Sequence, residues 1–191
     1  MTDGPRFKPL TENQMTDTQR QAVAELARGP RGRLNPGGPN STLLRSPDLM
    51  ARTQKVGEFL RYHSSLPTRL NEFAILVTAR QWSAQLEWVA HHPLAIKAGL
   101  DPAVADDLAR GNRPAAMQED EAAVYQFCTE LHEQRAVSDA TFKAVADRFG
   151  ERGVVDLIGV TGYYTLMAMV INVAREPLPD GVAAPLRSLG R

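Results

Sequence analysis

Cysteine is almost absent from this chain of 191 residues, which contains only Cys128. A single thiol forms no disulfide within a monomer, and this excludes the class of small secreted proteins that disulfides hold together. An excess of charge of one sign is also missing, because 22 Lys and Arg balance 22 Asp and Glu. A neutral composition gives no electrostatic reason to expect nucleic acid or an anionic membrane as a partner.

Long apolar runs are missing as well. The longest, residues 165–174, is interrupted by Asn172 and is shorter than a membrane span. The first residues have no apolar segment behind their positive charge, so they do not match a signal peptide. We therefore expect a cytoplasmic protein without a membrane, whose partners are small molecules or proteins.

The motifs of common cofactor and metal sites are also absent. Residues 36–39, Pro-Gly-Gly-Pro, match neither a P-loop nor the dinucleotide-binding fingerprint. The Gly-x-Ser-x-Gly nucleophile motif and the His-Glu-x-x-His pattern of zinc metalloproteases do not occur. We expect neither a cofactor nor a metal. Cys128 lies on the apolar side of its predicted helix, and we interpret it as part of the core rather than as a nucleophile.

Helical signals are present along most of the chain. Thr16 and Gln19 form a capping-box pattern, and Ser46 followed by Pro47 marks the start of a second helix. Pro93 falls within one predicted helix and is expected to kink or divide it. No alternation of apolar and polar residues persists long enough for a sheet. The predicted fold class is all-α with about seven to eight helices, which begin near residues 16, 46, 67, 83, 101, 119, 138 and 151.

Three segments divide the chain. Residues 1–45 contain the first helix and a loop, residues 31–44, that is rich in Gly, Pro and Asn. Residues 46–176 form the helical domain, and residues 177–191 form an extended tail with several prolines. A loop as long as 31–44 in a compact domain is usually functional or disordered, and the sequence leaves open whether it closes over a ligand.

Three polar residues in the centre of the chain are candidates for catalysis. Glu87 and His91 are four residues apart, so they project from the same face of one helix, where a carboxylate can orient an imidazole and raise its basicity. Glu72 belongs to the preceding predicted helix and meets them only if the chain folds back across residues 81–83. Ala84 lies one turn before the pair and leaves room beside it. A Glu–His pair with this spacing also occurs on solvated helix faces, so the sequence pattern leaves both roles open.

Aromatic residues near this segment are candidate ligand contacts. Trp82 and Trp88 flank the Glu–His pair and either wall an apolar pocket or pack in the core. Tyr163, in the last predicted helix, either offers its hydroxyl to a ligand or packs in the core or at an interface.

The segment from Glu72 to His91 resembles the active-site segment of the carboxymuconolactone decarboxylase and alkylhydroperoxidase D-like family. That family has Glu, then Cys, then Cys or Glu, then His at this spacing. In this chain the first Cys position is Ala84 and the second is Glu87. The acid/base groups of the pattern are therefore present, and its redox thiols are not.

The resemblance covers roughly residues 46–173. It includes Ser-Pro-Asp-Leu at 46–49, Val-Ser-Asp-Ala-Thr at 137–141 and Gly-Tyr-Tyr at 162–164. It implies a helical alkylhydroperoxidase D-like fold that commonly assembles into homo-oligomers, either trimers or hexamers, with sites near the subunit contacts.

The missing thiols distinguish between the branches of this family. A thiolate is the nucleophile of the peroxidase branch and alanine cannot replace it, so peroxidase activity is not expected, and Cys128 has no second Cys to resolve it. The decarboxylase branch needs no cysteine. The resemblance therefore implies a cofactor-free carboxy-lyase, or a related proton-transfer enzyme, acting on a small carboxylated lactone or keto acid in the catabolism of aromatic compounds.

In that reaction, His91 is the candidate acid that delivers a proton to carbon, with Glu87 orienting it. Glu72 either positions the substrate or serves as a second acid/base group. Arg80 or Arg45 is the candidate partner of a substrate carboxylate, and an exposed position without this role is the alternative for each. A second hypothesis is a non-catalytic, oligomeric small-molecule binder of the same fold, which is favoured if the three polar groups do not converge on a pocket.

Overall fold

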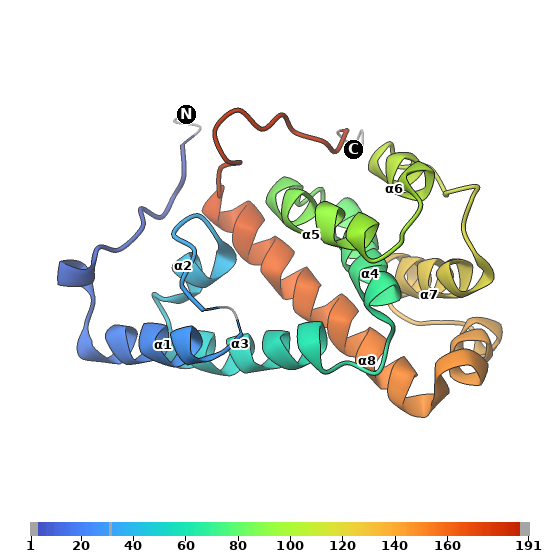
Figure 1. The fold of residues 1–191 in the computed structure, drawn as a ribbon, viewed down its shortest axis with the longest axis horizontal. Coiled ribbons are helices and arrows are strands. Elements are labelled where there is room, and N and C mark those ends of the chain that lie inside the picture. Colours follow the sequence, from blue (N-terminus) through green and yellow to red (C-terminus); the bar gives the residue numbers. More distant parts are fainter. Residues whose placement is uncertain (1–3, 31, 188–191) are drawn as a thin grey trace.

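The fold is all-α, as the sequence predicts. The computed structural model describes residues 4–30 and 32–187, and within these residues it contains helices and no strand. Eight α-helices and one short 3-10 helix follow one another along the chain (Figure 1). Their bounds are η1 Glu12–Gln14, α1 Asp17–Arg28, α2 Pro39–Leu43, α3 Pro47–Tyr62, α4 Thr68–Gln81, α5 Gln85–Lys97, α6 Pro102–Ala109, α7 Glu119–Gln134 and α8 Asp139–Ala174.

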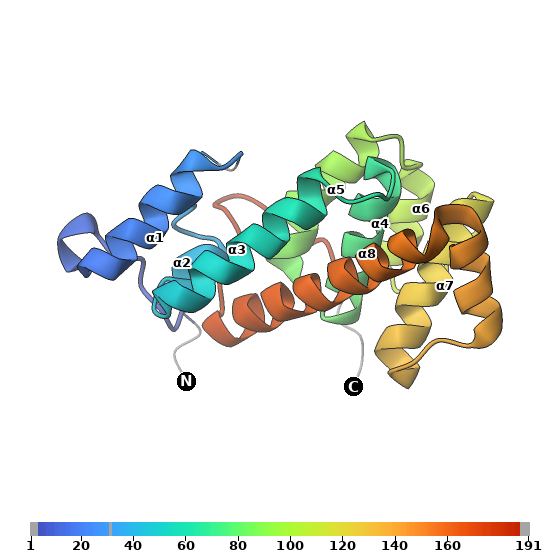
Figure 2. The same ribbon diagram turned by 90° about the horizontal axis from the view of Figure 1, so that it is seen from below.

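Helix α4 is the centre of the molecule. Every residue from Leu70 to Arg80 is buried, because α5, α7 and α8 pack around it. A helix that is enclosed on all sides needs apolar residues on all its faces, and the run Phe-Ala-Ile-Leu-Val at 73–77 meets this requirement. Helices α3 and α8 lie side by side (Figure 2), and α1 packs against α3 at one end of the molecule (Figure 1).

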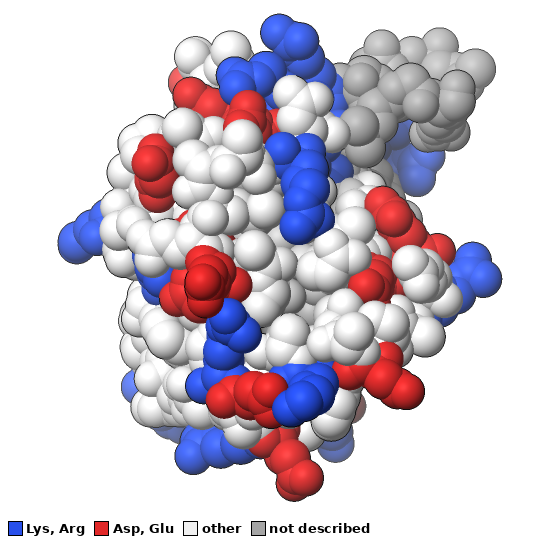
Figure 3. All heavy atoms as spheres, turned by 90° about the vertical axis from the view of Figure 1, so that its right-hand side faces the viewer, with Lys and Arg blue, Asp and Glu red and all other residues white. Residues whose placement is uncertain are grey.

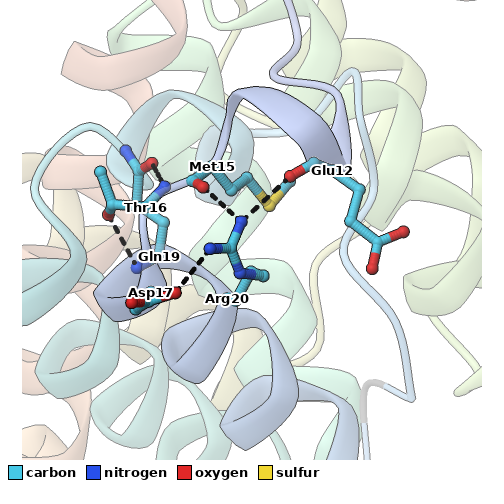
Figure 4. A network of polar contacts seen from close by, with 6 residues as sticks. All are labelled: Glu12, Met15, Thr16, Asp17, Gln19 and Arg20. Atoms are coloured by element: carbon cyan, nitrogen blue, oxygen red, sulfur yellow. Dashed lines mark hydrogen bonds and ion pairs between the residues drawn. The ribbon is translucent and has the colours of Figure 1, made fainter.

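Helix α1 begins as predicted. The Thr16 hydroxyl accepts a hydrogen bond from the backbone N–H of Gln19 at 3.3 Å, and the Gln19 side chain accepts one from the N–H of Thr16 at 2.9 Å. Arg20 adds an ion pair with Asp17 at 2.5 Å and a hydrogen bond to the Met15 carbonyl (Figure 4). The reciprocal capping box satisfies two backbone N–H groups that the start of a helix leaves without partners.

Other helix starts follow their sequence signals. Asp101 caps α6 by accepting a hydrogen bond from the N–H of Ala103 at 2.8 Å. Ser46 is the N-cap residue of α3, although its side chain makes no capping hydrogen bond. The predicted boundary at Gly150 is also present, because its φ of 69° interrupts the helical backbone inside α8. Only glycine adopts this left-handed region at little cost.

Three local features differ from the sequence prediction. The predicted loop 31–44 contains the short helix α2, which begins at Pro39, a residue whose fixed φ favours the first helical position. Five residues are too few to produce an apolar period, so the pattern did not reveal this helix. Ser83 does not cap α5, because it adopts a left-handed conformation, with φ 49°, in the turn before Ala84. Pro93 does not divide α5, which continues to Lys97 while packed along α4.

Helix α8 is the one described helix whose length and apolar composition would suffice for a membrane span. Its most apolar segment is 56% buried within the protein, and α3, α4 and α7 contact it. A core helix meets the same length and composition criteria, and these contacts are those of a core helix.

The segment after α8 is extended and packs back onto the fold. The backbone of Leu186 forms two hydrogen bonds with the side-chain amide of Gln85, an N–H donation at 2.9 Å and a carbonyl acceptance at 2.8 Å. Leu186 itself is buried. The described part of the tail, through residue 187, thus covers the first turn of α5.

Charges of both signs are mixed on the surface. Figure 3 shows Lys and Arg interspersed with Asp and Glu over one face of the molecule, in keeping with a formal net charge of zero. A mixed surface of this kind produces no strong field of one sign on that face.

Candidate functional site

The turn between α4 and α5 brings the predicted polar residues together. The N–H of Trp82 donates to the Thr78 carbonyl at 3.1 Å and closes α4, and the left-handed Ser83 then reverses the chain. Asn172 of α8 donates from Nδ2 to the Trp82 carbonyl at 2.9 Å and anchors this turn. Helix α5 consequently lies against α4, so that the faces carrying the three polar residues meet.

Glu72, Glu87 and His91 form one buried cluster. His91 Nδ1 is 2.6 Å from Glu72 Oε2, and His91 Nε2 is 3.3 Å from Glu87 Oε1. All three residues are at most 6% exposed. The two carboxylates therefore face opposite ring nitrogens of one imidazole, a geometry that favours the doubly protonated ring.

The electrostatics of the cluster follow from this geometry. Burial alone lowers the pKa of His91, but the interactions with Glu72 and Glu87 outweigh it, and the pKa of His91 is raised above its ordinary value of 6.5. The ring of Tyr164 packs edge-on against the imidazole, with centroids 5.0 Å apart. Burial, and after it the charge of Glu87, raises the pKa of Tyr164 well above 10, so that its hydroxyl stays protonated.

Two cavities adjoin the cluster. One, of about 320 Å³, is lined by Glu87 and His91 together with residues of the 30–40 segment and the end of α3. The other, of about 730 Å³, is lined by Glu72 together with the end of α3 and the end of α5. The cluster thus has access to space for a small molecule, although each of its side chains is almost fully buried.

Arg61 and Tyr62 line both cavities, and Arg33 lines the smaller one. Sequence reasoning missed these residues. Arg61 and Tyr62 end α3, and Arg33 lies in the predicted loop 31–44, so nothing in their spacing connects them with Glu87 or His91. The composition of that loop was the only signal, since long loops in compact domains are often functional.

The structure places the two candidate arginines away from the cluster. Arg80 is buried and donates to the carbonyl of Ala109 at 3.3 Å, and burial lowers its pKa. Arg45 donates to the Ser41 and Lys8 carbonyls and lies over the ring of Phe7. Neither residue lines a cavity beside His91. Their predicted role as partners of a substrate carboxylate therefore does not fit, because the fold directs Arg80 toward α6 and Arg45 toward the N-terminal segment.

The three candidate aromatic residues are also outside these cavities. Trp88 is buried, stacks on His92 at 5.9 Å, and lines a separate cavity beneath the C-terminal tail. Trp82 caps α4 in the turn, and Tyr163 packs edge-on against Tyr164 at 5.2 Å. Trp88 and Tyr163 thus contact other aromatic rings and Trp82 lies in the turn, and none of the three lines the space beside His91.

The two positions that bear on thiol chemistry are both buried. Ala84 is the N-cap of α5, is fully buried, and lines neither of the two cavities beside the cluster. Cys128 is also fully buried and lies 3.5 Å from the Thr161 hydroxyl. Burial raises the pKa of the Cys128 thiol to about 12, which keeps it from acting as a thiolate.

Within residues 4–30 and 32–187, no group of three or more His, Cys, Asp or Glu side chains is arranged to hold a metal ion. In the cluster itself, each ring nitrogen of His91 is directed at a carboxylate.

Comparison with known proteins identifies the fold. No protein-family model and no curated protein sequence matches the chain. Two solved structures resemble it over nearly their whole length. One is the alkylhydroperoxidase AhpD core of an uncharacterized peroxidase-related protein from Ralstonia eutropha JMP134, with a TM-score of 0.74 and 19% sequence identity, covering 92% of this chain and 93% of that one. The other is an uncharacterized peroxidase-related protein from Silicibacter sp. TM1040, with a TM-score of 0.73 and 14% identity, covering 94% of both chains. At these identities the likeness concerns the fold, and this chain has the fold of the alkylhydroperoxidase AhpD core.

Proposed function

We propose that this protein is a cofactor-free enzyme of the proton-transfer type, a carboxy-lyase or a related enzyme that acts on a small carboxylated lactone or keto acid. The observation that carries the proposal is the Glu72–His91–Glu87 cluster beside two cavities. A buried imidazole that carboxylates hold beside a small-molecule cavity can serve as a general acid.

The two contacts of His91 suggest different roles for its nitrogens. Glu72 lies 2.6 Å from Nδ1 and holds the ring in place, as the orienting carboxylate does in a catalytic triad. The Nε2 contact with Glu87 is longer, at 3.3 Å, and both residues line the smaller cavity. We therefore assign the transferable proton to Nε2. This exchanges the roles expected from the sequence, in which Glu87 orients the ring.

The proposed reaction is a decarboxylation followed by protonation at carbon. The bond between the substrate's α-carbon and its carboxylate breaks, CO₂ leaves, and the electron pair enters an enolate that spreads to the adjacent carbonyl oxygen. His91 Nε2–H transfers its proton to the carbanionic carbon. The neutral imidazole then regains a proton from water, so that one proton is consumed for each CO₂ released.

A non-catalytic binder is the alternative that one observation favours. The cluster also joins α4 to α5 within the core, and His91 is only 5% exposed. Buried charged networks of this kind can serve structure alone. The two functions differ in turnover, because a binder leaves its ligand unchanged.

Incubation of the purified protein with carboxylated lactones and keto acids tests the proposal, with CO₂ release and product followed by mass spectrometry. His91→Gln should abolish release, because glutamine has no transferable proton of this kind. His63→Gln is the matched control, since His63 is exposed at the end of α3, and it should retain full turnover. Release that persists in His91→Gln would refute the assignment. Binding of any of these lactones or keto acids without turnover would favour the non-catalytic binder.

We also propose that the protein is a homo-oligomer, either a trimer or a hexamer. Two adjacent helices, α3 and α8, each expose apolar side chains at helical spacing. They approach closely at Gly159, where an added Cβ would lie 3.0 Å from Leu60. Contiguous exposed apolar surface marks interaction sites. The exposed residues are Leu49, Val56 and Phe59 on α3, and Val155, Ile158, Met169 and Val173 on α8.

A further inference from the structure

Arg61 occupies the junction between the two cavities beside the Glu72–His91–Glu87 cluster. It lies in the last turn of α3 and lines both cavities. Its guanidinium lies over the ring of the neighbouring Tyr62, 5.3 Å from the centroid. Arg61 therefore presents its positive charge to the same space that His91 reaches.

The guanidinium of Arg61 has no anionic partner among residues 4–30 and 32–187. Its Nε is buried and makes no hydrogen bond. Arg69, which lines the larger cavity, differs in this respect because Asp120 and Glu121 pair with it. A buried N–H donor without a partner costs free energy, so Arg61 is held at this position without the compensation that Arg69 receives.

An anionic ligand that binds beside the cluster needs a nearby cation, such as Arg61, to offset the negative charge of the cluster. When all three groups are ionised, Glu72 and Glu87 contribute two negative charges and His91 one positive charge, which leaves an excess of one negative charge. This excess repels a carboxylate that approaches His91. Arg61 and Arg33, which both line the smaller cavity, reverse the balance there.

We propose that Arg61 and Arg33 together form a carboxylate-binding subsite in the smaller cavity and hold the substrate's acid group beside His91 Nε2. The proposal rests on the proposed function and names the residues that set its substrate class, a small organic carboxylate. The planar guanidinium of Arg61 suits bidentate pairing with a carboxylate. Leu86, Ala90 and Tyr62 supply the apolar and aromatic wall for the rest of the molecule.

Binding of three probes tests the subsite without turnover. Benzoate is the carboxylate, benzamide is its neutral analogue, and inorganic phosphate is an anion without an apolar part. Titration is followed through the ring resonances of His91 in NMR spectra. Wild-type protein should bind benzoate at millimolar concentration, and should bind benzamide and phosphate less well.

Four variants assign the binding to residues. Arg61→Gln should weaken benzoate binding roughly 10- to 100-fold, the range for loss of a hydrogen-bonded charge pair, and leave benzamide unchanged. Arg61→Lys should restore part of the loss, because it keeps the charge without the planar fork. Arg33→Gln, in an exposed loop, should also weaken benzoate binding. Arg52→Gln is the control, since Arg52 is exposed on α3 and pairs with Asp48.

Three results would overturn the proposal: no saturable binding of benzoate to wild type, equal affinity for benzoate in Arg61→Gln, or stronger binding of phosphate than of benzoate. None of these depends on catalysis. If His91→Gln abolishes turnover while Arg61→Gln binds benzoate normally, the subsite is wrong and the proposed function stands. If benzoate binding requires Arg61 but none of the carboxylated lactones and keto acids is turned over, the subsite stands and the proposed function fails.

Discussion

Glu72 Oε2 lies 2.6 Å from His91 Nδ1, although 19 positions separate the two residues in sequence. The contact joins α4 to α5 and is buried on both sides. It depends on the reversal of the chain at Ser83, so the local turn geometry and the chemistry of the site are directly connected. The first predictions concern this contact.

Replacing Glu72 with Gln should lower the pKa of His91, because the neutral amide no longer stabilises the imidazolium. The same change should lower the free energy of unfolding by about 1–3 kcal/mol, the usual cost of losing a buried charged hydrogen bond. NMR titration of the His91 ring and chemical denaturation measure the two effects. Glu133→Gln is the exposed control. An unchanged His91 titration in Glu72→Gln would contradict the role of this contact.

The raised pKa of His91 also predicts a pH dependence of stability. In the unfolded chain the imidazole titrates near 6.5, and in the folded protein it titrates higher. The stabilising contribution of the protonated ring is therefore fully present below pH 6.5 and is lost as the pH rises through the folded pKa. The stability difference between wild type and His91→Gln should shrink over that range. Equilibrium denaturation at a series of pH values measures it, and a difference that grows with pH would refute the assignment.

Glu130 should produce the opposite pH dependence. Its carboxylate accepts hydrogen bonds from the Ser138 N–H at 2.8 Å, the Thr141 hydroxyl at 2.7 Å and the Gln126 amide at 2.9 Å, which lower its pKa from 4.5 to about 2. Its contribution is present above pH 4.5 and is lost as the pH falls toward 2. Glu130→Gln should therefore be less stable than wild type at neutral pH, and the two proteins should become equally stable in strong acid. Acid denaturation followed by circular dichroism compares them.

Cys128 should be inert in the folded protein. With a pKa of about 12 and no exposure, the thiol is neither ionised nor accessible at neutral pH. Iodoacetamide should label it only after unfolding, as measured by mass spectrometry, and should leave any turnover unchanged. Rapid labelling of the native protein, together with loss of activity, would instead point to thiol chemistry.

A charge placed on the exposed face of α8 should disrupt the proposed oligomer. Ile158 is 49% exposed, so Ile158→Glu is tolerated by the single chain but unfavourable within an apolar contact. Size-exclusion chromatography with light scattering should show a lower mass for this variant. Phe142→Glu, at another exposed apolar position, is the control and should leave the mass unchanged. A wild-type protein that is monomeric at micromolar concentration would refute the proposed oligomer.

The sequence was sufficient to predict those features that depend on local chemistry. Two helix boundaries were predicted correctly, at the capping box of Thr16 with Gln19 and at Gly150. Both signals are local, because caps and left-handed residues act within one turn. The pairing of Glu87 with His91 followed from the helical period. The contact of Glu72 with His91 depends on the turn between α4 and α5. The sequence indicated this turn but did not define its geometry.

The residues that line the cavities beside His91 could not be predicted from sequence. Arg61 ends α3 and Arg33 lies between α1 and α2, and only tertiary packing brings them beside α5. Arg80 and Trp88, which are closer in sequence to the catalytic candidates, point elsewhere because neighbouring positions on a helix face different directions. Proximity in sequence was therefore misleading for both residues.

Helix α4 is enclosed by α5, α7 and α8 along its whole buried length, and it carries Glu72 near its start. Any shift of that carboxylate relative to α5 would disturb closely packed side chains on every side. The relative position of Glu72 and His91 is thus established when the core forms, before any ligand arrives. Such preorganisation removes the need to reorient polar groups during a reaction, and the cluster should keep the same geometry in the empty and the occupied protein.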